Sequence, residues 1–290
     1  MITRRLAIGA KRRGRSGRCA FVLSGGASLG AAQIGMLRAL YERDVVPDFL
    51  VGASAGALNA AFVATRPQLP STADELADVW RSLRRRDVFP LRPIAALRGL
   101  CGRTSHLVGD APLRSLVERH VQVELLEESP IALHLIAVDL RSGREVRLSD
   151  GPATDAVLAS AAIPAVFPAV RLGDMELIDG GVANHTPISH AVELGATTVY
   201  VLPTGDAARR PGSRPRGALA AALEATGLMT QRRLAADIAA YARTVELIVM
   251  PAPRTAVQPI DFSHADELIE QSLAAARAAL DAPAAAPLAA

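Results

Sequence analysis

The chain has 290 residues, of which half are hydrophobic, 21% are charged and only 3% are aromatic. This apolar content excludes disorder throughout, and the length suits one large α/β domain or two small ones. Residues 1–18 carry seven basic and no acidic side chains, so the net charge of +3 falls to −4 without them. A slightly acidic body argues against a protein that binds nucleic acid through a basic face.

The cysteines and the apolar runs indicate the compartment. Cys19 and Cys101 are the only cysteines and share no metal-ligand spacing, so neither a disulfide framework nor a metal site is predicted. No apolar stretch of about 7–15 residues precedes Cys19, so no secretory signal is expected. Residues 19–37 and 49–65 are uncharged, but turn-forming residues interrupt both runs and argue against a transmembrane segment. We therefore expect a cytoplasmic protein.

Two strand–turn–helix units follow residue 18. Residues 19–24 and 47–51 are short apolar runs that predict strands. Each is followed by a glycine-rich turn and then by a helical pattern, which reaches Leu40 in the first unit and covers residues 57–64 in the second. Uniformly apolar strands that alternate with helices are typical of a parallel sheet covered on both faces.

The alternation continues to residue 280. Further helices are predicted over residues 73–83, 111–120, 153–162, 188–194 and 266–280. Further strands are predicted over residues 132–139, 145–148, 175–178, 198–202 and 245–250. Residues 87–104 and 205–217 contain prolines and glycines without a clear period, so we expect a mobile flap and a solvated, arginine-rich loop. One domain over 19–280 would then lie between a basic, disordered segment 1–18 and an Ala/Pro-rich disordered tail 281–290.

The second turn matches a catalytic motif. Gly52-Ala53-Ser54-Ala55-Gly56 has the pattern G-x-S-x-G, in which a serine on a tight strand-to-helix turn projects its hydroxyl from the sheet edge. Larger side chains at the two glycine positions would clash in such a turn. We interpret Ser54 as a nucleophile, and a purely structural turn is the alternative.

The first turn can supply the donors that an oxyanion needs. Gly25-Gly26-Ala27 ends the preceding strand, and parallel strands end at the same side of a sheet, so its backbone N–H groups can face the same crevice. A phosphate-binding loop is the competing interpretation. The dinucleotide pattern requires glycine where Ala27 stands, ahead of Gly30, and no Gly-Lys-Ser/Thr follows, so a P-loop is excluded and a dinucleotide site is disfavoured.

The base that activates the serine must be an acid or a histidine. Asp179 closes a predicted strand, and Gly180 and Gly181 let the backbone turn sharply beneath its carboxylate. Three histidines follow Asp179 in the Ser–Asp–His order of hydrolase triads, namely His185, His190 and His264. The residues by themselves leave a Ser–Asp pair and a triad open.

These motifs together resemble the patatin-like phospholipase family. The resemblance adds residues 159–164, which read Ala-Ser-Ala-Ala-Ile-Pro, and the dipeptide Phe167-Pro168. It covers residues 19–202 and implies a three-layer α/β/α sandwich with a mostly parallel central sheet. It also implies a dyad without histidine, in which Ser54 is the nucleophile and Asp179 the general base and acid, with neither cofactor nor metal.

The family resemblance further implies that the amides of the first turn hold the oxyanion. Two residues depart from the usual Gly-Gly-Gly-x-Arg/Lys-Gly loop, because Ala27 replaces the third glycine and Leu29 replaces the basic residue. Ala27 still supplies an N–H group, whereas Leu29 removes a positive charge. An exposed carboxylate, with a pKa of about 4, would be too weak a base, so we expect a dry site in which Asp179 is partly desolvated.

The implied function is a serine-dependent acyl-ester hydrolase that releases fatty acid from a phospholipid or a related lipid ester. A triad esterase is one alternative, and a lipid-binding or regulatory protein with little turnover is the other, motivated by Leu29. The basic segment 1–18 could also attract an anionic membrane surface, where each basic residue contributes about 1 kcal/mol.

Overall fold

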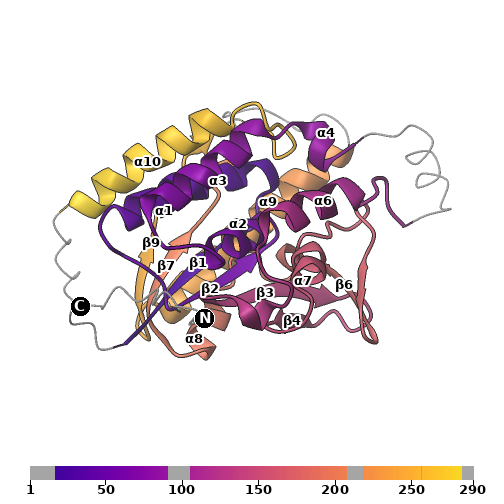
Figure 1. The fold of residues 1–290 in the computed structure, drawn as a ribbon, viewed down its shortest axis with the longest axis horizontal. Coiled ribbons are helices and arrows are strands. Elements are labelled where there is room, and N and C mark those ends of the chain that lie inside the picture. Colours follow the sequence, from indigo (N-terminus) through magenta and orange to yellow (C-terminus); the bar gives the residue numbers. More distant parts are fainter. Residues whose placement is uncertain (1–16, 91–104, 208–217, 256, 283–290) are drawn as a thin grey trace, which may run out of the picture.

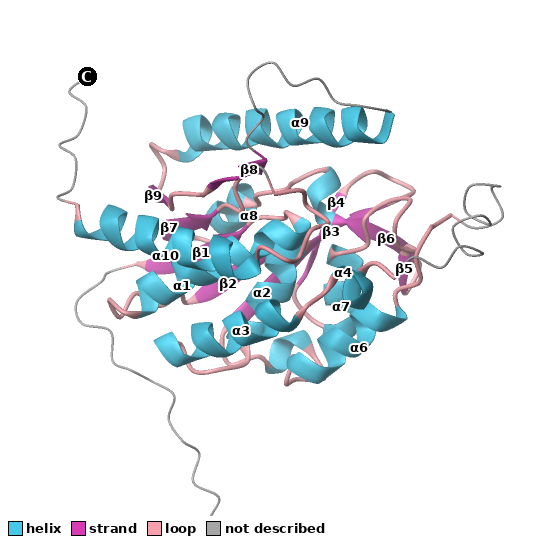
Figure 2. Ribbon diagram, turned by 90° about the horizontal axis from the view of Figure 1, so that it is seen from above, coloured by secondary structure: helices cyan, strands magenta, loops and turns pink. Residues whose placement is uncertain are grey.

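The computed structural model describes residues 17–90, 105–207, 218–255 and 257–282. A central eight-stranded sheet lies between two layers of helices (Figures 1 and 2). Its strands are β1 (Arg18–Leu23), β2 (Phe49–Ala53), β3 (Ala132–Asp139), β4 (Glu145–Leu148), β5 (Val170–Leu172), β6 (Met175–Asp179), β7 (Ala196–Leu202) and β9 (Glu246–Val249). Two short strands, β8 (Asp206–Ala207) and β10 (Arg254–Thr255), pair separately.

The order of the strands in the sheet is β5-β6-β3-β2-β1-β7-β9, and β4 pairs with β3 outside this path. The pairs among β3, β2, β1, β7 and β9 are parallel. The pairs that involve β4, β5 and β6 are antiparallel. The sheet is therefore mostly parallel, with an antiparallel portion beyond β3.

Most of the helices pack on one face of the sheet. They are α1 (Ala32–Tyr41), α2 (Ala55–Ala64), α3 (Pro70–Ser82), α6 (Ala111–His120), α7 (Ala153–Ser160) and α10 (Ala265–Asp281), with the short turn α4 (Arg85–Val88). The opposite face is covered by α8 (Ile188–Glu193) and α9 (Ala218–Tyr241), and Figure 2 shows α9 on the far side of the sheet from α1 and α3. The described residues also form the 3-10 turns η1 (Ala27–Ala31), η2 (Leu126–Glu128) and η3 (Gly180–Val182).

The apolar strands are buried on both faces. In β1, Phe21 and Leu23 belong to the hydrophobic cluster under α1 and α2, whereas Ala20 and Val22 belong to the cluster under α8 and α9. Successive side chains of a strand point to opposite faces, so a strand between two helix layers needs apolar residues at every position. The predicted α/β/α sandwich with a mostly parallel sheet is confirmed.

Some segments differ from the prediction. Helices α4 and α9 and the strands β5, β8 and β10 were not predicted, and Asp87 and Val88 lie in α4 instead of in a loop. The rest of the predicted flap, residues 91–104, and residues 208–217 of the arginine-rich loop lie outside the described residues. β1 begins at Arg18 and α10 ends at Asp281, and the remainder of the two flanking segments stays a prediction.

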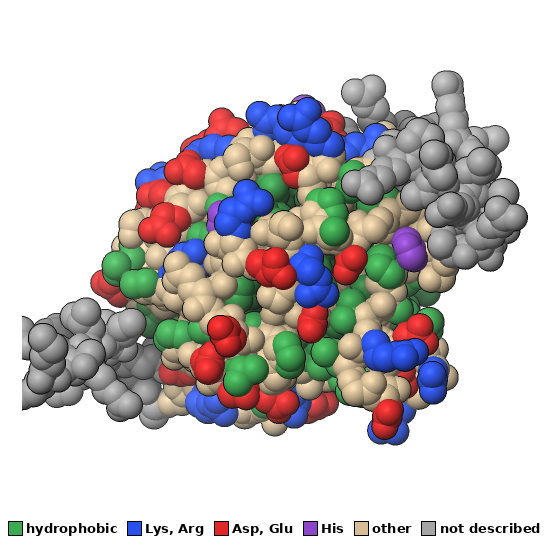
Figure 3. Space-filling model, turned by 45° about the vertical axis from the view of Figure 1, so that its right-hand side comes forward, with side chains coloured by type: hydrophobic (Ala, Val, Ile, Leu, Met, Phe, Trp, Pro, Cys, Tyr) green, Lys and Arg blue, Asp and Glu red, His purple; other side chains and the backbone are tan. Residues whose placement is uncertain are grey.

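The described part of the chain contains no helix that is long and apolar enough to cross a membrane. On the face in Figure 3, acidic and basic side chains of the described residues are interspersed.

Candidate active site

The topology brings two strand ends together. β2 and β6 lie on the same edge of β3, because β4 occupies its other edge, and they run in opposite directions. Ala53, the last residue of β2, pairs with Ile136, and Asp179, the last residue of β6, pairs with the adjacent Ala137. The carboxyl ends of β2 and β6 therefore converge, and Ser54 meets Asp179.

The two side chains form a direct hydrogen bond. The Ser54 hydroxyl donates to Oδ2 of Asp179 at 2.7 Å, and the Gly181 amide donates to Oδ1 at 2.7 Å. Asp179 is 5% exposed and forms no ion pair with a basic side chain in the described ranges. Burial raises the pKa of Asp179 to about 6, against the opposing effect of its two hydrogen bonds.

Ser54 lies on a strained turn. Its φ of 54° and ψ of −124° are unusual for a residue with a side chain, and they place it at the N-cap of α2. Ser160 holds this turn from α7, because the Ser54 amide donates to the Ser160 carbonyl at 3.0 Å and to its hydroxyl at 3.2 Å. The Ser160 hydroxyl donates in turn to the Ile136 carbonyl at 2.6 Å. Ser160 lies in the sequence motif at residues 159–164, but the motif alone predicts no role for it.

Glycines allow the strand ends to approach. A Cβ atom on Gly56 would overlap the backbone of Leu23, and one on Gly180 would overlap the carbonyl of Ile136. A Cβ atom on Gly52 would lie 2.6 Å from the carbonyl oxygen of Gly56. These contacts agree with the close packing expected from the sequence. Gly30 is similar, because a Cβ atom there would lie 2.9 Å from the Cβ atom of Ala55.

The glycine-rich loop lies directly beside this turn. The Gly25 amide donates to the His185 carbonyl at 2.9 Å, so it is already engaged. The amides of Gly26 and Ala27 donate no hydrogen bond to another described residue. Ala27 has a φ of 49°, in the left-handed region that favours glycine, and it lines the same cavity as Ser54. Two of the three predicted oxyanion donors are thus available.

The predicted histidines separate into two groups. His185 lies beside the turn, since a Cβ atom on Gly25 would be 3.0 Å from its ring and 3.2 Å from the Ser54 Cβ atom. His190 Nε2 lies 2.8 Å from a carboxylate oxygen of Glu145, and His264 pairs with an acidic side chain at the start of α10. Only His185 among the three is therefore near Ser54.

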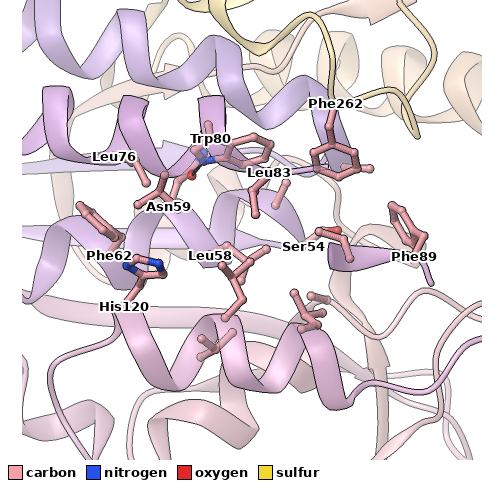
Figure 4. A pocket seen from close by; sticks show the side chains of 18 of the residues that line it. Ser54, Leu58, Asn59, Phe62, Leu76, Trp80, Leu83, Phe89, His120 and Phe262 are labelled. Carbon is pink, nitrogen blue, oxygen red and sulfur yellow. Dashed lines mark hydrogen bonds between the residues drawn. The ribbon is translucent and has the colours of Figure 1, made fainter. Parts of the chain in front are cut away.

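An apolar channel leads away from Ser54 between α2, α3 and α6. Five of the ten aromatic residues of the chain line it, namely Phe62, Trp80, Phe89, Phe167 and Phe262. Figure 4 shows Ser54 near Phe89 and Phe262 toward one end, and Phe62 with His120 at the other. A chain poor in aromatic residues has thus concentrated them around this channel.

A buried hydrogen-bond chain joins the channel wall to the glycine-rich loop. Trp80 Nε1 donates to Oδ1 of Asn59 at 2.8 Å, and the Asn59 amide donates to Gln33 at 2.8 Å and to the Gly30 carbonyl at 3.0 Å. The Gln33 amide then donates to the carbonyls of Ser24 and Leu202, both at 2.9 Å. Asn59 and Gln33 are fully buried, so these bonds fix the loop relative to α2 and α3.

Comparison with known proteins identifies the family. A family model described as "Patatin-like phospholipase" matches residues 21–192, more than half of the chain. The chain belongs to the patatin-like phospholipase family. The matched range contains both Ser54 and Asp179.

Curated relatives of this patatin-like chain include two described as uncharacterized NTE family proteins. The one from Mycobacterium bovis is 28% identical over 292 residues, which cover 90% of this chain and 46% of the relative. The one from Mycobacterium tuberculosis is 31% identical over 175 residues, which cover 60% of this chain and 45% of the relative. The chain spans about half the length of these relatives.

Two solved structures are similar to the patatin-like chain. VipD from Legionella pneumophila aligns with a TM-score of 0.49 and 14% identity, over 92% of this chain and 67% of VipD. ExoU, in its complex with SpcU from Pseudomonas aeruginosa, aligns with a TM-score of 0.45 and 15% identity, over 92% of this chain and 53% of the other.

The residue that departs from the family's basic position is part of the core. Leu29 lies in η1, is 4% exposed and belongs to the hydrophobic cluster under the helices.

In the described ranges of this patatin-like chain, no group of three or more His, Cys, Asp or Glu side chains could hold a metal ion.

Proposed function

We propose that the chain is a serine-dependent lipid acyl hydrolase in which Ser54 and Asp179 form the catalytic dyad. The observation that carries the proposal is the 2.7 Å hydrogen bond from the Ser54 hydroxyl to a buried carboxylate at the end of an apolar channel. Membership of the patatin-like phospholipase family supports hydrolysis of lipid esters.

The pKa of Asp179 suits a general base. A base is most effective when its pKa lies near the working pH, and burial moves Asp179 from 3.8 to about 6. The ionised carboxylate takes the proton as Ser54 Oγ attacks the ester carbonyl, and the protonated Asp179 then gives it to the departing alcohol. Water attacks the acyl-enzyme in the second half of the cycle. Its proton passes to Asp179 and returns to Ser54 Oγ as the fatty acid leaves.

Backbone amides around Ser54 are positioned to stabilise the oxyanion. Gly26 and Ala27 lie on the adjacent loop with N–H groups that no described residue accepts. In serine turns of this kind the residue after the nucleophile also contributes its N–H group, which here is Ala55. The N-terminus of α2 adds a favourable partial charge for a developing oxyanion. Loss of the basic residue at position 29 leaves this stabilisation to the backbone.

The apolar channel is suited to the acyl chain of the substrate. It begins at Ser54 and is lined almost entirely by aliphatic and aromatic side chains. Burying methylene groups there contributes about 0.8 kcal/mol each. The alcohol side of the ester would then face the open side of the turn.

Covalent labelling tests the nucleophile. A fluorophosphonate probe should add once to the wild-type protein and not to Ser54→Ala, as read by intact mass. Ser71→Ala, at an exposed serine of α3, is the matched control and should label like the wild type. An adduct that persists in Ser54→Ala would overturn the proposal.

A second candidate is a triad esterase that uses His185, favoured by the position of this ring beside Gly25. His185→Ala decides between the two. Turnover of a p-nitrophenyl ester should remain within about tenfold of wild type for a dyad, whereas a triad base contributes about 10²–10⁴-fold.

A further inference from the structure

The channel that begins at Ser54 has a defined far end. Helix α2 runs along it, with Ser54 at its N-cap and Phe62 eight residues later. At a rise of about 1.5 Å per residue, Phe62 lies roughly 12 Å along the helix axis from Ser54. His120, the last residue of α6, lies next to Phe62 with the ring centroids 6.1 Å apart (Figure 4).

Arg66 supports this end of the channel from behind. Its guanidinium lies over the Phe62 ring at 3.6 Å from the centroid. Its Nη1 atom donates to the carbonyls of Phe62 and His120, both at 2.9 Å, and so ties α2 to α6. The side chain is only 9% exposed and pairs with Glu75 at 3.5 Å. Phe62 and His120 are therefore held as a fixed wall.

A second cavity lies beside the channel, between the end of α3, α4 and the length of α6. This cavity shares Leu83, Leu116 and His120 with the channel. Its other lining residues are mainly polar or charged, namely Ser82, Asp87, Pro112, Ser115 and Arg119. An acyl chain that left the channel on this side would exchange apolar contacts for polar ones. Along α2, Phe62 is the last residue that lines the channel, so the apolar region suited to a hydrocarbon chain ends at Phe62 and the adjacent His120.

We propose that Phe62 and His120 form the end wall of the acyl site and limit the acyl chain to about eight to ten carbons, since an extended chain advances about 1.2 Å per bond over roughly 12 Å. This inference rests on the proposed function. It assigns a substrate class, medium-chain acyl esters, and two specificity-determining residues.

A series of p-nitrophenyl esters from four to sixteen carbons tests the wall. Wild-type kcat/KM should rise with chain length to about eight to ten carbons and then fall, by about fourfold for each methylene that is gained or excluded. His120→Ala should move the maximum to longer esters, so that the ratio of twelve-carbon to six-carbon turnover rises at least tenfold. His120→Trp should move it to shorter esters. Phe62→Leu is a second lengthening variant that keeps the site apolar.

Arg119→Ala is the matched control, because Arg119 is the exposed neighbour of His120 and lines the second cavity but not the channel. Its length profile should coincide with that of the wild type. Length profiles of the His120 and Phe62 variants that are parallel to wild type would overturn the end wall. Turnover that survives in Ser54→Ala would instead overturn the proposed function, so the two failures are distinguishable.

Discussion

Two carboxyl groups flank β3 at neighbouring positions and have opposite surroundings. Asp179 of β6 pairs with Ala137 on one edge, and Glu145 of β4 pairs with Val138 on the other. Among the described residues, Asp179 accepts bonds only from a hydroxyl and an amide, and burial raises its pKa to about 6. Glu145 accepts bonds from His190 and Asn184, and chiefly the bond from His190 lowers its pKa.

The difference shows how one sheet can hold a carboxyl group that is disfavoured as an anion and another that is stabilised as one. A buried carboxyl without a cationic partner is destabilised when ionised and is ready to take a proton. A carboxyl that accepts bonds from a histidine and an amide is stabilised as an anion. Glu145 also fixes the segment that follows Asp179, because Asn184 is fully buried in the loop after η3 and His190 lies in α8. One group would serve the reaction and the other its support.

The largest expected effect comes from Asp179→Asn. Without a base, kcat/KM for a p-nitrophenyl ester should fall about 10³-fold. The free energy of unfolding at pH 8 should increase in this variant. The wild type must hold an ionised carboxylate whose pKa in the folded state lies about two units above its value in the unfolded state, and this costs up to roughly 3 kcal/mol. Urea unfolding at pH 8 and pH 3.5 checks this, and the gain should vanish at the lower pH. Loss of both turnover and unfolding free energy in Asp179→Asn would instead indicate that Asp179 has a structural role.

The pH dependence of the wild type should give the next largest effect. Asp179 can accept a proton only when ionised, so kcat/KM should be level above pH 7 and fall about tenfold per unit below the pKa of about 6. The same raised pKa makes the folded state bind a proton that the unfolded state has released, so this group's contribution to stability declines between about pH 4 and pH 6. A pH profile of kcat/KM checks the midpoint, and a midpoint near 4 would show that Asp179 is not desolvated.

Much of the fold follows from local sequence pattern, and the parts that do not are tertiary. The ranges of α6, β3 and β4 match the predicted ones, because apolar periods and turn residues mark their limits. Helix α9 was missed because its alanine-rich sequence has no apolar stripe of helical period. The approach of β6 to β2 along one edge of β3 has no local signal, since strand direction depends on the whole sheet.

The candidate site likewise has parts that local sequence pattern predicts and parts that depend on tertiary packing. Ser54 and Asp179 were predicted as site residues from glycines beside strand ends, and the structure brings their side chains together. The bond from the Gly25 amide to the His185 carbonyl, and the left-handed φ of Ala27, depend on how the loop packs. Distant elements form the channel, so its end wall had no motif in the sequence.

The smallest expected effect comes from Glu145→Gln, which tests the other half of the comparison. Loss of the charge weakens the bonds from His190 and Asn184, so the free energy of unfolding at pH 7 should fall by about 1 kcal/mol. Because the pKa of Glu145 is lower in the folded than in the unfolded state, its stabilisation of the fold is present above the unfolded-state pKa and is lost as the pH falls through the folded-state pKa. The difference in unfolding free energy between Glu145→Gln and the wild type should therefore narrow below about pH 4.

Turnover by Glu145→Gln should remain within about threefold of wild type and keep its midpoint near pH 6, because Glu145 makes no contact with Ser54 or Asp179. Glu193→Gln is the matched control, since this exposed carboxylate lies 3.7 Å from the other nitrogen of His190. Glu193→Gln should change neither the turnover nor the midpoint of its pH profile. If Glu145→Gln reduced turnover as strongly as Asp179→Asn while leaving stability intact, the two carboxyl groups would act as one unit, and the environment of each would no longer explain its role.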